Sequence, residues 1–336
     1  MQDTLCPKVE LHRHLDCSMR FSTMLDIAKE LDMKLPASVE EQKKFFLLTN
    51  PLENLGMVLG KFRMAQRLLH SYDVLERLAF ETVTEAALEN TKLLELRYSP
   101  TFIQDGHPQL QWDLIHQAFV RGIHRAQQNH DIGVGIIIII QRTLPVAIAD
   151  SVTDFAINNK DSIVALDLAD NEDGFDAKSF ESTFQRARSA GLHITVHAGE
   201  VPTPQSVINV EESILRLGAE RIGHGIQSIK SEKVIKLLRD KNIALEVCPT
   251  SNYLTQVVPK LVQHPLRNLQ KQGVALTIST DDPGVFDYTL TQELDVVKNV
   301  LGFSDSEISQ FQTIAFQHSF IPSSTKQKYA RLFEVP

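Results

Sequence analysis

Short runs of apolar, β-branched residues recur along this chain and alternate with longer stretches in which apolar residues return every three or four positions. The short runs are typical of strands, and the longer stretches are typical of amphipathic helices. Ile136–Ile140 is the plainest run, and its lack of polar residues indicates a strand buried on both faces of a parallel sheet. The pattern predicts eight strands, at Lys8–Leu15, Leu93–Tyr98, Val134–Gln141, Ile163–Leu168, His193–His197, Arg221–Gly225, Ala244–Val247 and Val274–Ser279.

Helical patterns separate these strands, and the clearest cover Asp73–Asn90, Leu110–Gln128 and Phe175–Ala190. Eight strands that alternate with helices favour an α/β fold, a (β/α)8 TIM barrel formed by residues 1–336 as a single domain. The first crossover, residues 17–92, is too long for one helix. We therefore expect extra helices in this crossover, over the mouth of the barrel, where a lid would lie.

The composition of the chain excludes several classes of protein. Among 336 residues, 43% are hydrophobic and 23% are charged, which excludes a fibrous or mostly disordered chain. The net charge of −8 predicts no nucleic-acid partner and no attraction to a membrane surface. The apolar runs are too short to span a membrane, and the N-terminal residues lack the pattern of a signal peptide. Three cysteines without a CxxC pair favour a cytoplasmic protein, and the oligomeric state is left open.

The first predicted strand has two histidines and an aspartate whose side chains are expected on the same face. His12, His14 and Asp16 are two residues apart, so the period of a strand places all three on one face. Two imidazoles with this spacing can bind one metal ion from the same side. An HxH pair by itself is more often a chance or structural feature, so the interpretation needs support from other strands.

Three later strands also end in polar residues that can do chemistry. The fifth runs into His197 and Glu200, the sixth contains His224 between two glycines, and the eighth ends in Asp281 and Asp282. In a (β/α)8 barrel the carboxyl ends of the strands form the active-site face. Each of these residues alone would more often be structural, but together they are expected to meet at one site.

With these motifs in place, the chain resembles the adenosine deaminase family of the amidohydrolase superfamily. The resemblance covers nearly the whole length and depends on six motifs in order: KVELHRHLD, LELRYSP, ITVHAGE, RIGHG, CPTSN and STDDPGVF. It implies a zinc-dependent hydrolytic deamination, with one zinc ion per chain and a small-molecule purine nucleoside as the substrate. Three neutral imidazoles and a carboxylate are also a donor set that suits zinc.

The resemblance implies a role for each candidate residue. The zinc ligands would be His12, His14, His197 and Asp281. Glu200 would carry a proton to the purine ring, which requires a raised pKa, and His224 would position and activate the water. Asp282 would contact purine N7, and Asp16 would reach the ribose.

Two positions depart from the family pattern. The family usually has glycine where this chain has Cys17 and Asp170. The N–H of the second glycine commonly meets purine N3; Asp170 keeps an N–H, but its Cβ restricts how closely the backbone can approach a ligand. Both changes lie on the ribose and purine side of the site, away from the metal ligands. The deaminase chemistry is therefore better supported than the identity of the substrate.

We expect adenosine or 2′-deoxyadenosine as the substrate, because the Asp16 carboxylate can accept a hydrogen bond from a ribose hydroxyl and would repel a 5′-phosphate. A modified adenine nucleoside such as aminodeoxyfutalosine, or adenine itself, is the alternative. A two-metal amidohydrolase is disfavoured, because the end of the fourth strand reads LDLADNEDG, without a lysine to bridge two metals. A catalytically inactive binding barrel is the alternative from a different class.

Five residues near the motifs are left out of the predicted site. His193, deeper on the fifth strand, is interpreted as a core or supporting histidine. Glu95 and Arg97 point to one face of the second strand, where an internal ion pair and a substrate contact are equally consistent with the pattern. Ser251 and Asn252 are expected to form hydrogen bonds behind the site.

Overall fold

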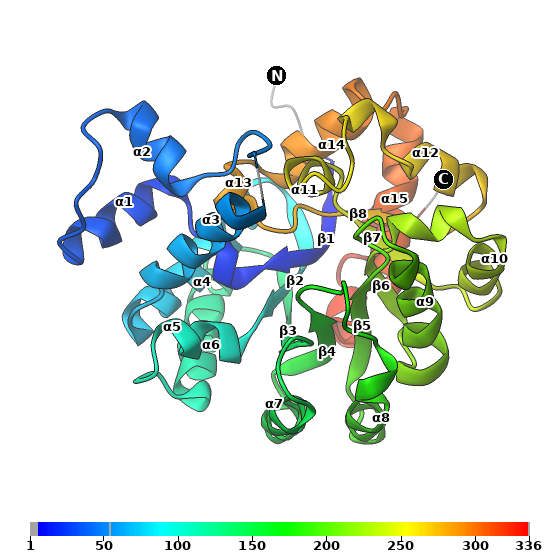
Figure 1. Cartoon of the computed structure of the whole chain (residues 1–336), viewed down its shortest axis with the longest axis horizontal. Helices are drawn as coiled ribbons and strands as arrows, with labels where there is room; N and C mark the ends of the chain where they lie inside the picture. Colours follow the sequence, from blue (N-terminus) through cyan, green and yellow to red (C-terminus); the bar gives the residue numbers. More distant parts are fainter. Residues whose placement is uncertain (1–5, 54, 335–336) are drawn as a thin grey trace.

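Eight parallel strands form one sheet, in which each strand pairs with its neighbours in the sequence, in the order β1 to β8. The computed structural model describes residues 6–53 and 55–334. Helices follow the strands and surround them on the outside (Figure 1). An isolated parallel bridge between Arg13 and Asp281 joins β1 to the segment after β8, so the sheet curves back on itself. The predicted (β/α)8 barrel is confirmed.

All eight predicted strands are present, with small differences at their ends. Their bounds are β1 Lys8–His14, β2 Thr91–Tyr98, β3 Gly133–Gln141, β4 Ile163–Ala169, β5 His193–Ala198, β6 Arg221–His224, β7 Ala244–Val247 and β8 Leu276–Ile278. The last strand starts later than expected, because the Val274 N–H still bonds to the Leu269 carbonyl at the end of the preceding helix (3.3 Å). Ile136–Ile140 in β3 are all buried, as expected for a strand covered on both faces.

The first crossover carries the expected extra helices. These are α1 Phe21–Glu30, α2 Val39–Phe46, α3 Leu55–Leu68 and α4 Tyr72–Leu88. The helices after β2 are α5 Pro100–Gly106, α6 Trp112–Gln127, α7 Val146–Asn158, α8 Glu181–Ser189, α9 Pro204–Glu212, α10 Glu232–Asp240, α11 Pro249–Leu254, α12 Leu266–Lys271, α13 Pro283–Phe286, α14 Leu290–Asn299, α15 Asp305–His318 and α16 Ser323–Lys326. None of the helices in the described part of the chain is long and apolar enough to cross a membrane.

Helix α3 lies over the carboxyl end of the barrel. It contacts the 3-10 turn Leu15–Cys17, α5 and α13, and each of these follows the carboxyl end of a strand. Helices α1 and α2 extend to one side, at the upper left of Figure 1. The expectations that these helices act as a lid, and that residues 1–336 form a single domain, stay predictions.

The two faces of the strands have different surroundings. Ile136, Ile138 and Ile140 of β3 belong to the main apolar core, together with side chains of the surrounding helices. By contrast, Arg97 and Glu246 are fully buried and form an ion pair (Nη2 to Oε2, 2.7 Å). Branched apolar side chains usually fill the interior of such a barrel. Here charged side chains occupy part of the interior, beneath the strand ends.

Candidate active site

The ends of β1 and β8 meet through backbone hydrogen bonds, and this contact positions three of the predicted site residues. The His14 N–H donates to the Asp281 carbonyl (2.8 Å), and the Asp281 N–H donates to the His12 carbonyl (3.0 Å). Asp281 has a φ of +67°, a left-handed conformation that aspartate adopts more readily than most residues. Its Oδ1 atom then lies 3.2 Å from both His12 Nε2 and His14 Nε2.

His12 is held by a carboxylate on the opposite side of its ring. Its Nδ1 lies 2.7 Å from Glu246 Oε2, and the pKa of Glu246 is held well below its usual range against the effect of burial, first by Arg97 and then by Arg221. An ionised carboxylate can only accept, so His12 Nδ1–H donates and Nε2 keeps its lone pair. Gly223 makes room for this ring, because a Cβ there would lie 2.9 Å from His12 Cε1.

His197 has the same arrangement. Its Nδ1 lies 2.9 Å from Asp167 Oδ2, and Arg97 Nη1 bonds to the same oxygen at 2.7 Å. Burial lowers the pKa of His197 to about 3, so its imidazole is neutral near pH 7. His197 Nε2 lies 3.2 Å from His14 Nε2. Ring nitrogens from β5 and β1 thus approach the same point.

The donor set fits a divalent metal ion. Four residues place one ligand atom each within 4.8 Å of one another: His12, His197, His224 and Asp281. A second group shares Asp281 and adds His14 and Asp282. The buried His12 Nε2 has no hydrogen-bond partner among the described residues. Although burial opposes it, attraction by Asp282 and Asp281 raises the pKa of His14 to about 9, so this end of the barrel attracts positive charge.

His224 and Glu200 lie beside this cluster. His224 ends β6 with a φ of +59°, and its Nε2 lies 3.7 Å from Glu200 Oε2 and 3.8 Å from Asp281 Oδ2. Burial raises the pKa of Glu200, with smaller contributions from Asp281 and Glu172. A carboxyl group with a raised pKa beside a metal-binding cluster is suited to proton transfer.

A carboxylate that sequence reasoning missed holds the loop that carries Glu200. Glu172 lies in the loop after β4, and its two oxygens accept hydrogen bonds from the backbone N–H groups of Gly199 (3.0 Å), Glu200 (2.7 Å) and Val201 (2.9 Å). The Asn209 side-chain amide donates to it as well (3.2 Å). Glu172 is buried, so it fixes the backbone on both sides of Glu200.

Asp16 and Asp282 lie on the His14 side of the cluster. Asp16 lies in the 3-10 turn after β1, where its Oδ2 accepts a hydrogen bond from the Ser99 N–H (3.0 Å). Its Oδ1 is buried without a hydrogen-bond partner among the described residues. Burial, and next the charge of Asp281, raises the pKa of Asp282 well above its usual range. The thiol of Cys17, also buried, donates to Asp282.

Asp170 takes the backbone conformation that favours glycine. Its φ is +79°, and its side chain is exposed. The carboxylate accepts hydrogen bonds from Thr143 Oγ1 and from Gln141 Nε2 (3.3 Å), near the end of β3. An aspartate thus preserves the left-handed turn that a glycine would make, while its side chain bonds to the neighbouring β3 segment.

Of the residues left out of the site, His193 differs from its expected role, whereas Glu95 and Arg97 form internal ion pairs, one of the two alternatives left open for them. His193 is not a core or supporting histidine: it lies at the amino end of β5, is about half exposed and pairs with Glu220 (2.9 Å). Glu95 and Arg97 do not pair with each other. Glu95 pairs with Arg221 (2.6 Å), whereas Arg97 pairs with carboxylates of β4 and β7. The expected bonds behind the site are present, since Ser251 Oγ donates to Asp281 Oδ2 (2.6 Å).

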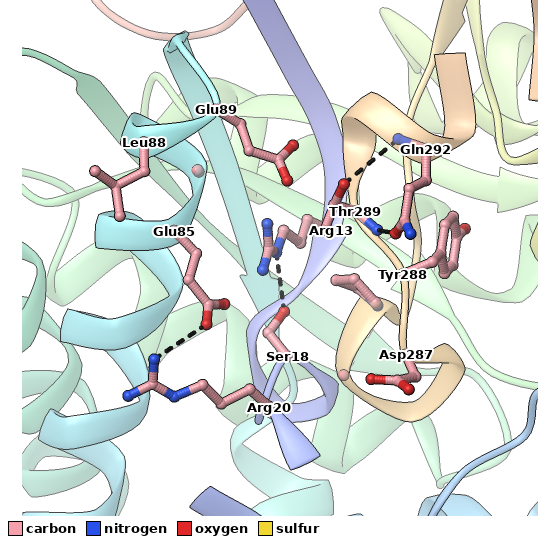
Figure 2. Close-up of a pocket in the computed structure, with 13 residues that line it drawn as sticks. Arg13, Ser18, Arg20, Glu85, Leu88, Glu89, Asp287, Tyr288, Thr289 and Gln292 are labelled. Atoms are coloured by element: carbon pink, nitrogen blue, oxygen red, sulfur yellow. Dashed lines mark hydrogen bonds and ion pairs between the residues drawn. The ribbon is translucent and has the colours of Figure 1, made fainter. Parts of the chain in front are cut away.

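A cavity of about 580 Å³ lies on the other side of β1 and holds none of the predicted site residues. Figure 2 shows Arg13 of β1 reaching between α4 and the segment that contains α13 and α14. Arg13 alternates with His12 and His14, so its side chain points away from the cluster. Its Nε donates to Ser18 Oγ (3.1 Å), and Arg20 pairs with Glu85 nearby (3.4 Å).

Comparison with known proteins relates this geometry to a family. Residues 7–334 match the family model described as adenosine deaminase. The chain is 34% identical to an adenosine deaminase from Shewanella loihica over 328 residues, which is 97% of this chain and 98% of that protein.

Solved structures share the fold. The N6-methyl-AMP deaminase from Arabidopsis thaliana is 27% identical, with a TM-score of 0.83, and the match covers 98% of this chain and 96% of that one. An adenine deaminase from Arthrobacter aurescens is 23% identical, with a TM-score of 0.88, and the match covers 98% of this chain and 97% of that one. These relatives are named for a nucleoside, a nucleotide and a free base.

The Glu172 contacts predict that Glu172→Gln loosens the loop around Glu200. Hydrogen bonds to a charged acceptor contribute about 1.5–3 kcal/mol each, and the amide loses the charge and part of the accepting capacity. We expect hydrogen exchange of the amides at Gly199–Val201 to accelerate about 10- to 100-fold. Glu181→Gln is the matched control, because Glu181 pairs with Arg216 at the surface. Unchanged exchange in Glu172→Gln would contradict the role given to Glu172.

Proposed function

The chain belongs to the adenosine deaminase family, and on that premise we propose that it hydrolyses a 6-aminopurine nucleoside, with adenosine and 2′-deoxyadenosine as the leading substrates. One observation carries the proposal. Imidazoles and a carboxylate converge on one point, and the Glu200 carboxyl, with its raised pKa, lies beside them. The predicted cytoplasmic location is part of the proposal.

We propose that one zinc ion binds to His12, His14, His197 and Asp281. The orientation of the rings supports this choice. Glu246 and Asp167 accept hydrogen bonds from Nδ1–H of His12 and His197, so the Nε2 lone pairs of both rings are available to a metal ion. Neutral nitrogen ligands with one carboxylate suit zinc and leave a coordination position open. Zinc bound there would supply Lewis acidity that activates a water molecule at neutral pH.

The other residues have distinct tasks in this proposal. Glu200 begins protonated and donates to purine N1, which takes up the electron pair displaced by the attack on C6. His224 orients the attacking water. Asp282, whose raised pKa favours the protonated form, donates a hydrogen bond to N7, and the Asp170 N–H faces N3. The Glu200 carboxylate then accepts the proton of the new C6 hydroxyl and passes it to the amino group, which leaves as ammonia when the C6–N bond breaks.

Asp16 supports a nucleoside over the other substrates named among the relatives. Its Oδ1 is buried without a hydrogen-bond partner among the described residues, with His14 Nδ1 4.0 Å away, and a ribose hydroxyl would supply a donor. A 5′-phosphate would add a second negative charge beside this carboxylate, and free adenine would leave it unpaired. The second candidate is a modified adenine nucleoside such as aminodeoxyfutalosine, because Cys17 and Asp170 stand where the family usually has glycine, on the ribose and purine side of the site.

The metal ligands generate a prediction for Asp281→Asn. Asparagine tolerates the positive φ of this position, so the fold is expected to survive while the neutral amide binds zinc weakly. We expect metal content to fall well below the one equivalent per chain of the wild type, and activity to fall with it. Asp287→Asn is the matched control, because Asp287 also has a positive φ (+55°) and pairs with Lys43 on the surface. Two metal equivalents in the wild type would contradict the mononuclear site.

Glu200→Gln is expected to retain zinc and to lose about 10²- to 10⁴-fold in kcat, because positioned proton transfer contributes that much to a reaction rate. The measurement is ammonia release from adenosine, with metal analysis of the same sample. Glu211→Gln is a suitable control, since Glu211 pairs with Lys233 on α10 at the surface. Near wild-type turnover by Glu200→Gln would show that another group moves the proton.

Substrate choice is tested with kcat/KM for adenosine, adenine, AMP and aminodeoxyfutalosine. We expect adenosine to be preferred, and Asp16→Ala to lower kcat/KM for adenosine about 10- to 100-fold, because it removes a hydrogen bond to the sugar. Turnover of adenine is the internal control, since it has no ribose and should change little. A wild-type preference for adenine or AMP would overturn the substrate assignment.

A further inference from the structure

The three buried histidines of the first group, His12, His197 and His224, differ in the hydrogen-bond partner of their Nδ1 atom. Carboxylates accept from Nδ1 of His12 and of His197. His224 Nδ1 instead faces the side-chain amide of Asn252, at 3.2 Å from Nδ2. A carboxylate can only accept a hydrogen bond from a ring nitrogen, whereas an amide NH2 can only donate to it. The position of the proton on each ring follows from this difference.

A chain of hydrogen bonds fixes which end of the Asn252 amide faces His224. The Leu266 backbone N–H donates to His264 Nδ1 (3.1 Å), so in the neutral ring the proton lies on Nε2. His264 Nε2 then donates to Asn252 Oδ1 (3.2 Å). The opposite end of the amide, the NH2 group, is thereby turned towards His224 Nδ1.

This chain of bonds is protected from water. Asn252 is fully buried, and His224 and His264 are nearly so, with exposed fractions of 1% and 6%. Burial also lowers the pKa of His264 to about 3, so the ring stays neutral at physiological pH. The direction of the chain is set by a backbone N–H, which can donate but not accept. Reversing the amide would place two donors against His264 and would leave a buried carbonyl against His224.

We propose that Asn252 and His264 are positioning residues that hold His224 as the Nε2–H tautomer. This proposal rests on the proposed function and deepens it. With the proton on Nε2, His224 donates into the space between Glu200 and Asp281 and has no lone pair there for a metal. His224 is thus kept out of the metal's ligand set although its Nε2 lies within ligand distance of the others. The partner of Nδ1 therefore decides the role of each ring. His12 and His197 are left with an Nε2 lone pair for a metal ion, whereas His224 is left with an Nε2–H that donates a hydrogen bond.

Asn252→Asp tests this assignment directly. A carboxylate at this position accepts from both histidines, so the proton of His224 is expected to move to Nδ1, as in His12 and His197. The readout is nitrogen NMR of the zinc-loaded enzyme labelled at histidine, with the His224 signals assigned by their absence in His224→Gln. We expect Nε2–H in the wild type, Nδ1–H in Asn252→Asp, and a loss of about 10²-fold or more in kcat. Nδ1–H in the wild type, or an unchanged tautomer in Asn252→Asp, would overturn the proposal.

His264→Phe provides a second variant should the new carboxylate prevent folding. It removes the donor that orients the Asn252 amide, so both tautomers of His224 are expected. His116→Phe is the matched control, because His116 of α6 is also buried but bonds to Tyr98 at the end of β2 and to Ser162 just before β4. Equal effects of the two variants on the His224 signals would contradict the chain of hydrogen bonds from His264 through Asn252. If no 6-aminopurine were turned over while the predicted tautomers were observed, the proposed function would be wrong, whereas the positioning role of Asn252 and His264 would still be supported.

Discussion

The buried carboxylate of Glu246 is the group on which the geometry of the site most depends. It accepts from His12 Nδ1 (2.7 Å), Arg97 Nη2 (2.7 Å), Arg221 Nε (2.6 Å) and Thr195 Oγ1 (2.9 Å). Side chains from five strands therefore meet at one carboxylate. A buried charge is costly unless it is fully paired, and removing one partner of such a group costs about 3–5 kcal/mol. The network thus adds little net stability while it penalises any other arrangement of the strands.

The same charges determine the chemistry one layer above. Arg97 bonds to both Glu246 and Asp167, so the carboxylates behind His12 and His197 share a cation. Arg97 is the first cause that lowers the pKa of Glu246, and it lowers the pKa of Asp167 after His197, so it helps to keep both carboxylates ionised as acceptors. In this part of the barrel interior, charged side chains take the place of apolar packing and orient the histidine rings above them. Because these side chains are on strands, the position of the rings is fixed by the sheet rather than by loops.

Sequence reasoning reached the barrel and the converging histidines because both depend on local patterns. Strand runs, the HxH spacing and polar strand ends are visible without tertiary contacts. Glu172 was missed because it lies in a polar loop, where an acidic residue is unremarkable, and its role arises from backbone groups of another loop. His193 was misplaced because it shares a face with His197, yet four residues of strand separate them by about 13 Å. A lone glutamate within the apolar β7, Glu246, was an unused signal of a buried ion pair.

The joining of β1 to the segment after β8 has a consequence for how the protein is made. The N–H of His12 bonds to Ser279, which is 267 residues further along the chain, and the adjoining Asp281 closes the barrel. At about 5–20 residues per second, a ribosome needs roughly 13 to 55 s to synthesise that interval. Throughout this time the nascent chain exposes the unpaired edge of β1 and two histidines without their carboxylate partner. The cluster of candidate metal ligands and the closure of the barrel therefore both depend on the last strand, and a chain interrupted before β8 lacks Asp281 and the segment that pairs with β1.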